Sequence, residues 1–170
     1  NERRNPSNGQ YLGDVKLSEG DNGEAPVAGW DLTTRQPKSI SILWAFGDKE
    51  TRDGIDECMR NAAEMTIDYF ENEYATTRAG QGGVASVSAD GVAGFVFDHY
   101  DNRNGDPQPH KHIVISNRVR RSSDKVWTAL DGRKIYAGMV EISEVHENLL
   151  QDLLTERFGW SWNLKQDHDT

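Results

Sequence analysis

The sequence has almost no cysteine. Cys58 is the single cysteine among 170 residues, so the chain cannot form an internal disulfide. Cys58 stands among apolar residues at helical spacing, which favours a buried structural thiol over a nucleophile. A chain of this length can form a real core, and one domain, residues 1–170, is the expected organisation.

Long hydrophobic runs are also absent. No segment approaches the apolar length of a membrane-spanning helix, and there is no secretory apolar core. These absences predict a soluble intracellular protein. The chain begins at Asn1 rather than at Met, and we expect it to be an N-terminally trimmed piece of something longer.

Positive charge is in short supply, because 19 Lys and Arg against 28 Asp and Glu give a net charge of −9. This balance argues against a nucleic-acid-binding domain, which is usually basic. Acidic residues gather at 48–73 and 141–156, where they are typical of solvated helix faces. The basic residues cluster elsewhere, at Lys111, Arg118, Arg120, Arg121 and Lys125. A local basic groove on an acidic body is compatible with this pattern, and its phosphate contacts should weaken with salt.

What the chain does contain is a histidine-rich stretch between two apolar runs. His99 follows the run 92–97, and His110 and His112 lead into the run 113–115. The residues between are rich in Asn, Asp, Gly and Pro and predict a loop. Residues two apart in a strand point to the same face, so two antiparallel strands joined by this loop would bring three imidazoles together. Such a cluster makes a divalent-metal site with positions open for water or substrate, as catalysis requires.

The apolar spacing along the rest of the chain predicts an α+β fold. Strands are expected at 27–34, 84–88, 92–99, 110–119 and 126–130, the second and third joined by a hairpin-type turn at 89–91. Helices are expected from Pro37 onward, at 51–74 and at 133–158, the last ended by Gly159. We expect a loop-rich segment at 1–26 and a disordered tail at 163–170. This order suggests helices packed on one face of an antiparallel sheet.

The histidine stretch resembles the relaxase domain of conjugative plasmids, the TraI/TrwC/TraA or MobF type among the HUH endonucleases. The family motif runs from a His through a Ser-Arg-x-x-Asp-Pro-like loop to His-x-His and an apolar strand that ends in Asn. Its counterparts here are His99, the loop 102–107, His110, His112 and Asn117. Residues 28–45 match the family's Gly-aromatic-Asp-Leu-Thr-Phe-x-x-Pro-Lys-Ser segment, and residues 153–159 resemble the end of its long helix. The resemblance covers roughly residues 8–162, and three matched segments in the right order are a specific signal.

The resemblance implies a more specific fold and a function. The fold would be a palm-like central sheet of five antiparallel strands, with the histidine cluster on its exposed side. The function would be nicking and rejoining of one DNA strand at a plasmid's origin of transfer, through a phosphotyrosine. The implied partners are single-stranded plasmid DNA and other conjugation proteins, for a monomer in the bacterial cytoplasm. Imidazole ligands leave Zn, Mn, Ni and Mg open as the metal.

The resemblance also suggests roles for residues outside the histidines. Asp31 matches the family's aspartate beside the active site, where it would orient a ligand His or assist the nucleophile. Candidate contacts to DNA are Arg103, Lys38, Lys111 and Arg118. For Arg103 a solvent-exposed loop side chain is an equally good interpretation, and for Lys38 an exposed lysine is only slightly weaker. His146 and His168 lie outside the motif and are excluded as ligands.

The nucleophile departs from the family pattern. The family's catalytic tyrosine precedes the Gly-aromatic-Asp segment by a long way, whereas only 28 residues precede Gly29 here. Tyr11 stands in a segment like the family's Thr-Gly-x-x-Leu-Gly linker, so we expect it to be structural and the nucleophile to be absent from this chain. Tyr100 is expected to pack or to stack on a base. The fragment would then bind metal and DNA without nicking.

Two other functions remain open from the sequence. A three-His metalloenzyme acting on a small molecule, as in cupin-like oxygenases, would need an enclosed barrel pocket. A non-catalytic single-strand-binding module would stack bases on aromatic side chains, although most of these are expected to be core. The candidates for stacking are Trp30, Trp44, Trp127 and Tyr100.

Overall fold

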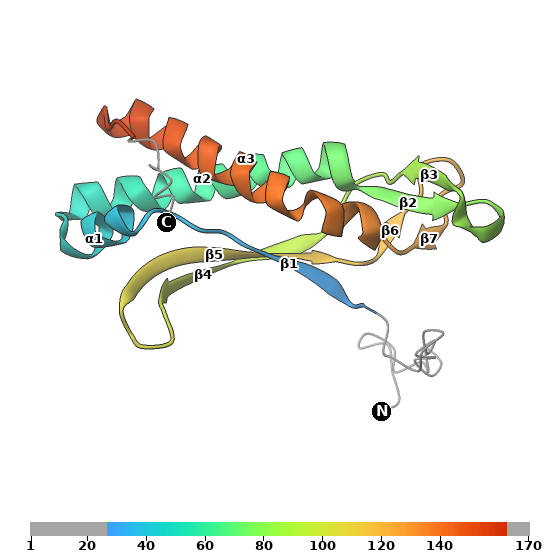
Figure 1. The fold of residues 1–170 in the computed structure, drawn as a ribbon, viewed down its shortest axis with the longest axis horizontal. Coiled ribbons are helices and arrows are strands. Elements are labelled where there is room, and N and C mark those ends of the chain that lie inside the picture. Colours follow the sequence, from blue (N-terminus) through green and yellow to red (C-terminus); the bar gives the residue numbers. More distant parts are fainter. Residues whose placement is uncertain (1–26, 163–170) are drawn as a thin grey trace, which may run out of the picture.

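The computed structural model describes residues 27–162, and the segments 1–26 and 163–170, with the loop and tail expected there, lie outside this range. The described part combines strands with helices, as an α+β fold requires (Figure 1). The strands are β1 (Gly29–Thr33), β2 (Thr76–Ala79), β3 (Ala85–Ser88), β4 (Gly94–Asp101), β5 (Pro107–Ser116), β6 (Val119–Arg120) and β7 (Trp127–Thr128). The helices are α1 (Lys38–Phe46), α2 (Lys49–Tyr74) and α3 (Gly132–Phe158), with a short 3₁₀ turn η1 (Gln81–Gly83).

The principal sheet has three antiparallel strands in the order β1-β5-β4. The expectation of five strands is therefore not confirmed for residues 27–162. The other strands form two separate two-stranded sheets, β2 with β3 and β6 with β7. Strand β5 is central, so both of its edges are paired, whereas β1 and β4 are the edge strands of this described sheet.

The expected hairpin between 84–88 and 92–99 is wrong. Strand β3 pairs with β2, which the sequence analysis did not identify as a strand. The reversal between β2 and β3 runs through Gly80, Gly82 and Gly83, all with positive φ, a conformation that glycine adopts without a steric penalty. The turn at 89–91 instead redirects the chain to β4, and Glu71 of α2 accepts a hydrogen bond from the backbone N–H of Val92 at 2.9 Å.

The long helices begin and end where the sequence predicts, within two residues. Asp48 caps α2 by accepting a hydrogen bond from the backbone N–H of Thr51 at 2.8 Å. Asp131 caps α3 in the same way through Arg133, at 3.2 Å. Gly159 ends α3 with φ 70°, the left-handed conformation that commonly stops a helix. Within residues 27–162, none of the helices combines the length and the apolar character of a membrane-spanning segment.

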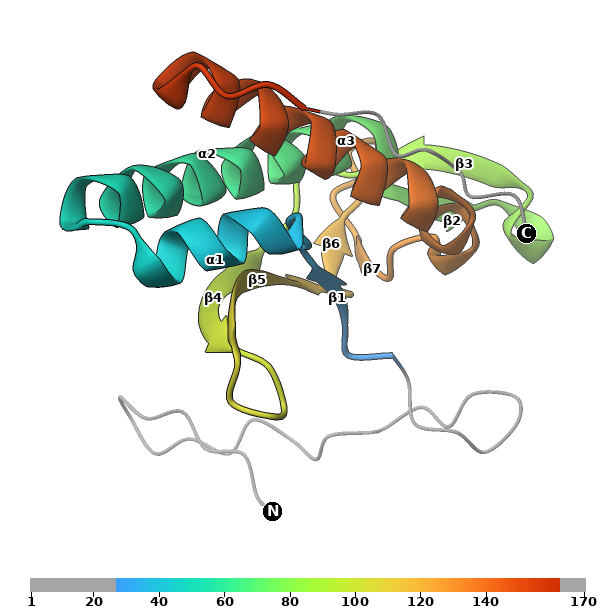
Figure 2. The same cartoon turned by 60° about the vertical axis from the view of Figure 1, so that its left-hand side comes forward.

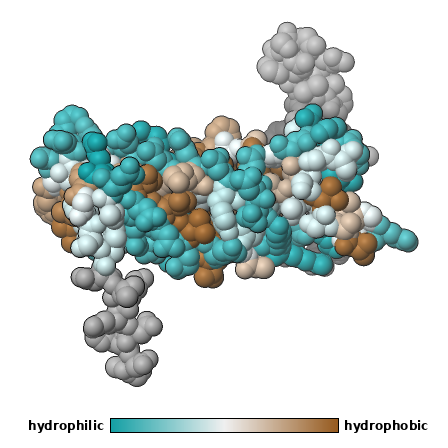
Figure 3. All heavy atoms as spheres, turned by 90° about the horizontal axis from the view of Figure 1, so that it is seen from above, coloured by the Kyte–Doolittle hydropathy of each residue, from teal (hydrophilic) through white to brown (hydrophobic). Residues whose placement is uncertain are grey.

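All three helices lie on the same side of the β1-β5-β4 sheet (Figures 1 and 2). The burial of β5 alternates because the helices cover only one face of the sheet. Lys111, Ile113 and Ile115 are buried, and their neighbours are half-buried. The buried face joins a core that includes Phe70 of α2 and Ile142 of α3. The outer surface of the helical layer is largely hydrophilic (Figure 3). The core therefore lies between the sheet and the helices, and the opposite face of the sheet is not covered by any described helix.

Candidate metal centre

The hairpin formed by β4 and β5 carries the histidines, as the sequence predicts. His99 on β4 lies directly opposite His110 on β5. The connecting loop is organised by Asn102, whose Oδ1 accepts hydrogen bonds from the backbone N–H groups of Asn104 at 2.8 Å and Asp106 at 3.0 Å. The Asn102 amide in turn donates to the Asp106 carboxylate at 3.0 Å, so Asp106 helps to shape the loop.

Three imidazoles converge on the face of the sheet that the helices leave open. His112 follows His110 by two residues and therefore points to the same face. The three rings each offer a nitrogen, and these nitrogens lie within 4.8 Å of one another. The ring centroids are 4.6 to 5.2 Å apart. His99 is exposed and the other two are half-buried, so one side of the cluster is open to solvent.

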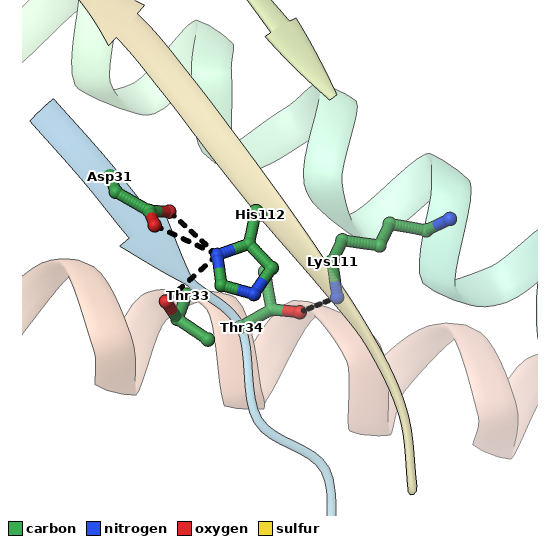
Figure 4. A network of polar contacts seen from close by, with 5 residues as sticks. All are labelled: Asp31, Thr33, Thr34, Lys111 and His112. Carbon is green, nitrogen blue, oxygen red and sulfur yellow. Dashed lines mark hydrogen bonds and ion pairs between the residues drawn. The ribbon is translucent and has the colours of Figure 1, made fainter. Parts of the chain in front are cut away.

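Hydrogen bonds orient two of the three rings. His112 Nδ1 lies 2.8 and 3.0 Å from the two carboxylate oxygens of Asp31 (Figure 4). His110 Nδ1 lies 2.7 Å from the Gln108 carbonyl oxygen. A carbonyl and a carboxylate only accept, so Nδ1 carries the proton in both rings, and in the neutral form of each ring Nε2 keeps its lone pair. A bare Nε2, with a proton donated to a carboxylate or carbonyl, is the usual state of a metal-bound histidine, so this donor set fits a divalent cation.

Asp31 reaches the cluster because β1 pairs with β5. Thr33 lies directly opposite His112, and Asp31 lies opposite Val114, on the same face. Thr33 Oγ1 also lies 3.3 Å from His112 Nδ1 (Figure 4). A segment about 80 residues away in sequence thus supplies the carboxylate beside the ligand ring, which is the position that the sequence analysis proposes for Asp31.

The four basic residues suggested for DNA lie in different places. Arg103 is exposed in the loop of the hairpin. Lys38 begins α1 beside that loop, its Nζ 3.4 Å from the Pro107 carbonyl oxygen. Arg118 follows the far end of β5, about 20 Å along an extended chain from His112. Lys111 points to the helix side, where its side chain is 8% exposed and paired with Asp98. The structure therefore brings Lys38 and Arg103 to the histidine end of the hairpin. Lys111 lies at the same end but points to the opposite face, and Arg118 lies further away.

Four contributors to this face were not identified from the sequence. Two orient the rings, Thr33 and the Gln108 carbonyl. The other two are Phe95 and Phe97 on β4, which are 72% and 50% exposed on the same face as His99. The two-residue spacing from Asp31 to Thr33, and from Phe95 through Phe97 to His99, could have located the side chains. No sequence signal marks a backbone carbonyl.

The tyrosines in the described residues are engaged away from the cluster. Tyr69 and Tyr74 donate hydrogen bonds to Glu141, which raises the pKa of each phenol to about 12. Tyr100 stacks on Trp44 of α1 at 5.4 Å, so it packs rather than faces the histidines, and burial raises its pKa. Tyr136 packs edge-on against Trp30 at 5.2 Å. Tyr11 lies outside the described residues.

The stacking candidates from the sequence are mostly occupied within the fold. The Trp30 indole donates to Asn117 at 3.2 Å and the Trp44 indole donates to Asp56 at 2.9 Å. Trp127 is 59% exposed on β7. Trp30, Trp44 and Tyr100 therefore stabilise the fold, and the exposed rings beside the histidines are Phe95 and Phe97.

His146 lies in the helical layer. It is 5% exposed, and its Nδ1 lies 2.9 Å from the Thr66 hydroxyl of α2. Burial lowers the pKa of the imidazole to about 4, so the ring is neutral at physiological pH. His146 also lines a cavity of about 350 Å³ between β1 and α3. It is not part of the metal cluster, and His168 lies outside the described residues.

An antiparallel sheet covered by helices on one face, with a His-x-His strand and a third histidine on the open face, is the arrangement that the resemblance to relaxases implies. The family described as TrwC relaxase matches residues 2–170 of the chain. The chain therefore belongs to the TrwC relaxase family, the conjugative relaxases of the MobF type.

Comparison with individual proteins agrees with this assignment. The chain is 25% identical over 161 residues to the multifunctional conjugation protein TraI of Escherichia coli, covering 90% of this chain and 9% of TraI. The copper-bound structure of the conjugative relaxase TrwC in complex with OriT DNA superposes with a TM-score of 0.76 at 27% identity, covering 92% of this chain and 52% of TrwC. A metal-free TrwC complex with OriT DNA gives a TM-score of 0.77 at 26% identity, with 93% and 54% covered. The chain thus spans about half of the TrwC chains and a small part of TraI.

Proposed function

We propose that this chain forms the metal-binding part of a relaxase that nicks and rejoins one DNA strand at a plasmid's origin of transfer during conjugation. The reaction would be transesterification, in which a tyrosine oxygen replaces the 3′ oxygen at the scissile phosphate and the reverse step reseals the strand. The observation that carries this proposal is the cluster of three imidazoles on an open sheet face, in a member of a family whose relative TrwC is known in complex with OriT DNA.

His99, His110 and His112 would hold the divalent cation, for which Mg, Mn, Zn and Ni are the candidates. Three neutral ligands leave the cation its full charge, and it would polarise and orient the phosphodiester. Asp31 would accept the Nδ1 proton of His112, which orients the ring and raises the basicity of its Nε2. The existence of a copper-bound structure of the relative TrwC supports a metal ion as part of this proposal.

A single DNA strand would lie across the open face. Phe95 and Phe97 present exposed rings there, on which unpaired bases could stack. Lys38 and Arg103 would contact backbone phosphates at the loop end, with Arg103 suited to bidentate contacts. Arg118 would contact phosphates further along the strand, and Lys111 is not proposed for DNA because its ammonium is paired on the other face. An open face favours a polymeric substrate over a small molecule, which would need an enclosed pocket.

The attacking tyrosine is proposed to lie outside the described residues. Tyr69, Tyr74, Tyr100 and Tyr136 have packing or hydrogen-bonding partners elsewhere. We propose that Tyr11 is not the nucleophile and that the attacking tyrosine is not among the residues of this sequence. On that basis the chain alone binds metal and DNA without cleaving, and a nicking assay in which cleavage occurs but is lost in Tyr11→Phe would contradict this placement.

We also propose the setting in which the domain acts. Residues 1–170 would form a single relaxase domain whose sheet reaches five strands when further strands add to the edges of β1 or β4. It would act as a monomer in the bacterial cytoplasm, with other conjugation proteins. Sedimentation of the chain at several concentrations tests the monomer directly.

The decisive experiment measures Mn²⁺ affinity and single-stranded oligonucleotide binding in the parent and in His110→Ala. Loss of one of three ligands should weaken Mn²⁺ binding by more than about 100-fold, above the effect of losing an outer partner. Oligonucleotide binding should fall with rising salt. The matched control is His168→Ala, which removes a histidine outside the motif.

Each failure identifies an alternative. Mn²⁺ binding without affinity for oligonucleotides would favour the three-His enzyme acting on a small molecule. Salt-sensitive oligonucleotide binding without metal affinity would favour the non-catalytic binding module.

A further inference from the structure

The three histidines are not held in the same way. His110 and His112 stand on the central strand β5, and each ring donates to a protein acceptor. His99 stands on the edge strand β4, is exposed, and has no hydrogen bond to its ring from any described residue. Its direction therefore depends on the backbone of β4 and on packing against the other two rings, and the question is what fixes that backbone.

An ion pair on the opposite face of the sheet stands next to His99. Asp98 lies directly opposite Lys111, one step from the His99–His110 pair. The Lys111 ammonium contacts the Asp98 carboxylate. Figure 4 shows the Lys111 side chain extending away from His112. The Lys111 side chain is 8% exposed, whereas that of Asp98 is 49% exposed. Candidate metal ligands and ion-pair residues therefore alternate along both strands of the hairpin. Asp98 precedes His99 on β4, and Lys111 lies between His110 and His112 on β5.

The regular pairing of β4 ends at this point. The register shifts between His99 and Asp101, so residues beyond His99 are no longer matched one to one with β5. A slip of one residue would turn His99 to the other face, because side chains alternate along a strand. The residue after His99, Tyr100, is held on the helix side by its stack on Trp44. Both neighbours of His99 are thus anchored on the covered side.

We propose that the Asp98–Lys111 ion pair positions His99 for metal binding, although neither side chain touches the cation. The pair locks the step of the β4–β5 register next to the His99–His110 pair, and a nearly buried ammonium without its carboxylate would force the strands apart or draw in water. The ion pair thus orients His99 indirectly, through the backbone of β4, whereas the Gln108 carbonyl and Asp31 orient the other two rings by direct hydrogen bonds. This inference rests on the metal site of the proposed function and adds two residues that set its affinity.

The test removes each charge at constant size. Lys111→Met keeps the apolar stem, and Asp98→Asn keeps the shape of the carboxylate. Each should weaken Mn²⁺ binding about tenfold, the lower end for loss of an outer partner. The matched control is the Lys49–Asp53 ion pair of α2, which is exposed at 87% and 59%. Lys49→Met and Asp53→Asn make the same chemical changes away from the site and should leave Mn²⁺ affinity unchanged.

Two further measurements separate positioning from general stability. Lys111→Arg restores the charge and should recover most of the Mn²⁺ affinity. In the metal-free protein, the NMR signals of the His99 ring should shift or broaden in Asp98→Asn, while those of His112 stay in place. A merely structural role would lower the unfolding temperature without selecting one ring.

Unchanged Mn²⁺ affinity in a folded Asp98→Asn overturns the proposal. If Lys111→Met does not fold, Asp98→Asn decides alone, because its side chain is half exposed and on an edge strand. If the parent itself does not bind Mn²⁺, the result contradicts the metal site of the proposed function. The His99 ring signals then still decide whether the ion pair positions this histidine.

Discussion

The two faces of strand β5 differ in burial and in the kinds of side chain they carry, although their residues alternate along the same stretch of sequence. On one face Ile113 and Ile115 are each 1% exposed and pack under the helices. On the other face His110, His112 and Val114 are half-buried and look away from the helices. Neighbouring residues therefore serve opposite purposes, since burial on the covered face stabilises the fold and openness on the other admits a ligand.

This difference explains how a strand can carry three polar rings beside its core. Imidazoles that had to be buried would need partners for all their nitrogens. On the open face a lone pair can point to solvent or to a cation. Because the helices pack on one face only, substitutions on that face should mainly lower stability. Substitutions on the other face should mainly weaken metal binding.

The largest expected effect is a difference in stability between variants of two adjacent residues of β5. Ile113→Ala should lower the free energy of unfolding by about 4 kcal/mol, since it leaves a cavity in a packed core. Val114→Ala, on the half-buried face, should cost about 1 kcal/mol or less. Urea denaturation of the metal-free protein measures both. Similar losses in the two variants would mean that the open face is covered in solution.

The second largest expected effect is a loss of folding stability at acid pH, caused by His146 on the covered side of the sheet. Burial lowers the pKa of His146 in the fold to about 4 from the ordinary 6.5, so the unfolded chain takes up the proton first. Its contribution is complete above pH 6.5 and is lost as the pH falls to about 4, a change of about 3 kcal/mol.

The control for this pH effect is His146→Gln, whose amide can still bond to Thr66 but does not titrate. The free energy of unfolding should be measured across this pH range in both proteins, because the difference cancels the carboxylates common to them. A difference that does not change with pH would show that the fold does not lower the pKa of His146.

The smallest expected effect belongs to the open face. Asp31→Asn keeps the shape but removes the carboxylate that accepts from His112, and should weaken Mn²⁺ binding about tenfold. The free energy of unfolding should change little, because the Asp31 side chain is 50% exposed. Calorimetric titration with Mn²⁺ measures the affinity. Asp53→Asn, on an exposed helix surface, is the matched control and should bind as the parent does.

Local patterns predicted much of the fold. Helical spacing and capping residues such as Asp48 and Gly159 act within one or two turns, so the two long helices were located correctly. The histidine hairpin was predicted for the same reason, since its loop and its alternation are local. Strand pairing was harder, and β3 was assigned to the wrong partner because β2 is short and mostly polar. Which strand a segment joins depends on long-range contacts that alternation cannot distinguish.

The amino-acid sequence alone determined which residues share a face of the hairpin, and therefore that His99, His110 and His112 would meet. The resemblance to relaxases already implied that Asp31 would lie beside a ligand histidine and that the histidine face would be open. Only the tertiary structure decided that this ligand is His112 and that Lys111 points to the helices. The physical reason is that strand alternation is a property of a few consecutive residues. Which face is buried depends on where helices distant in the sequence pack, and that is decided by the apolar area of the whole chain.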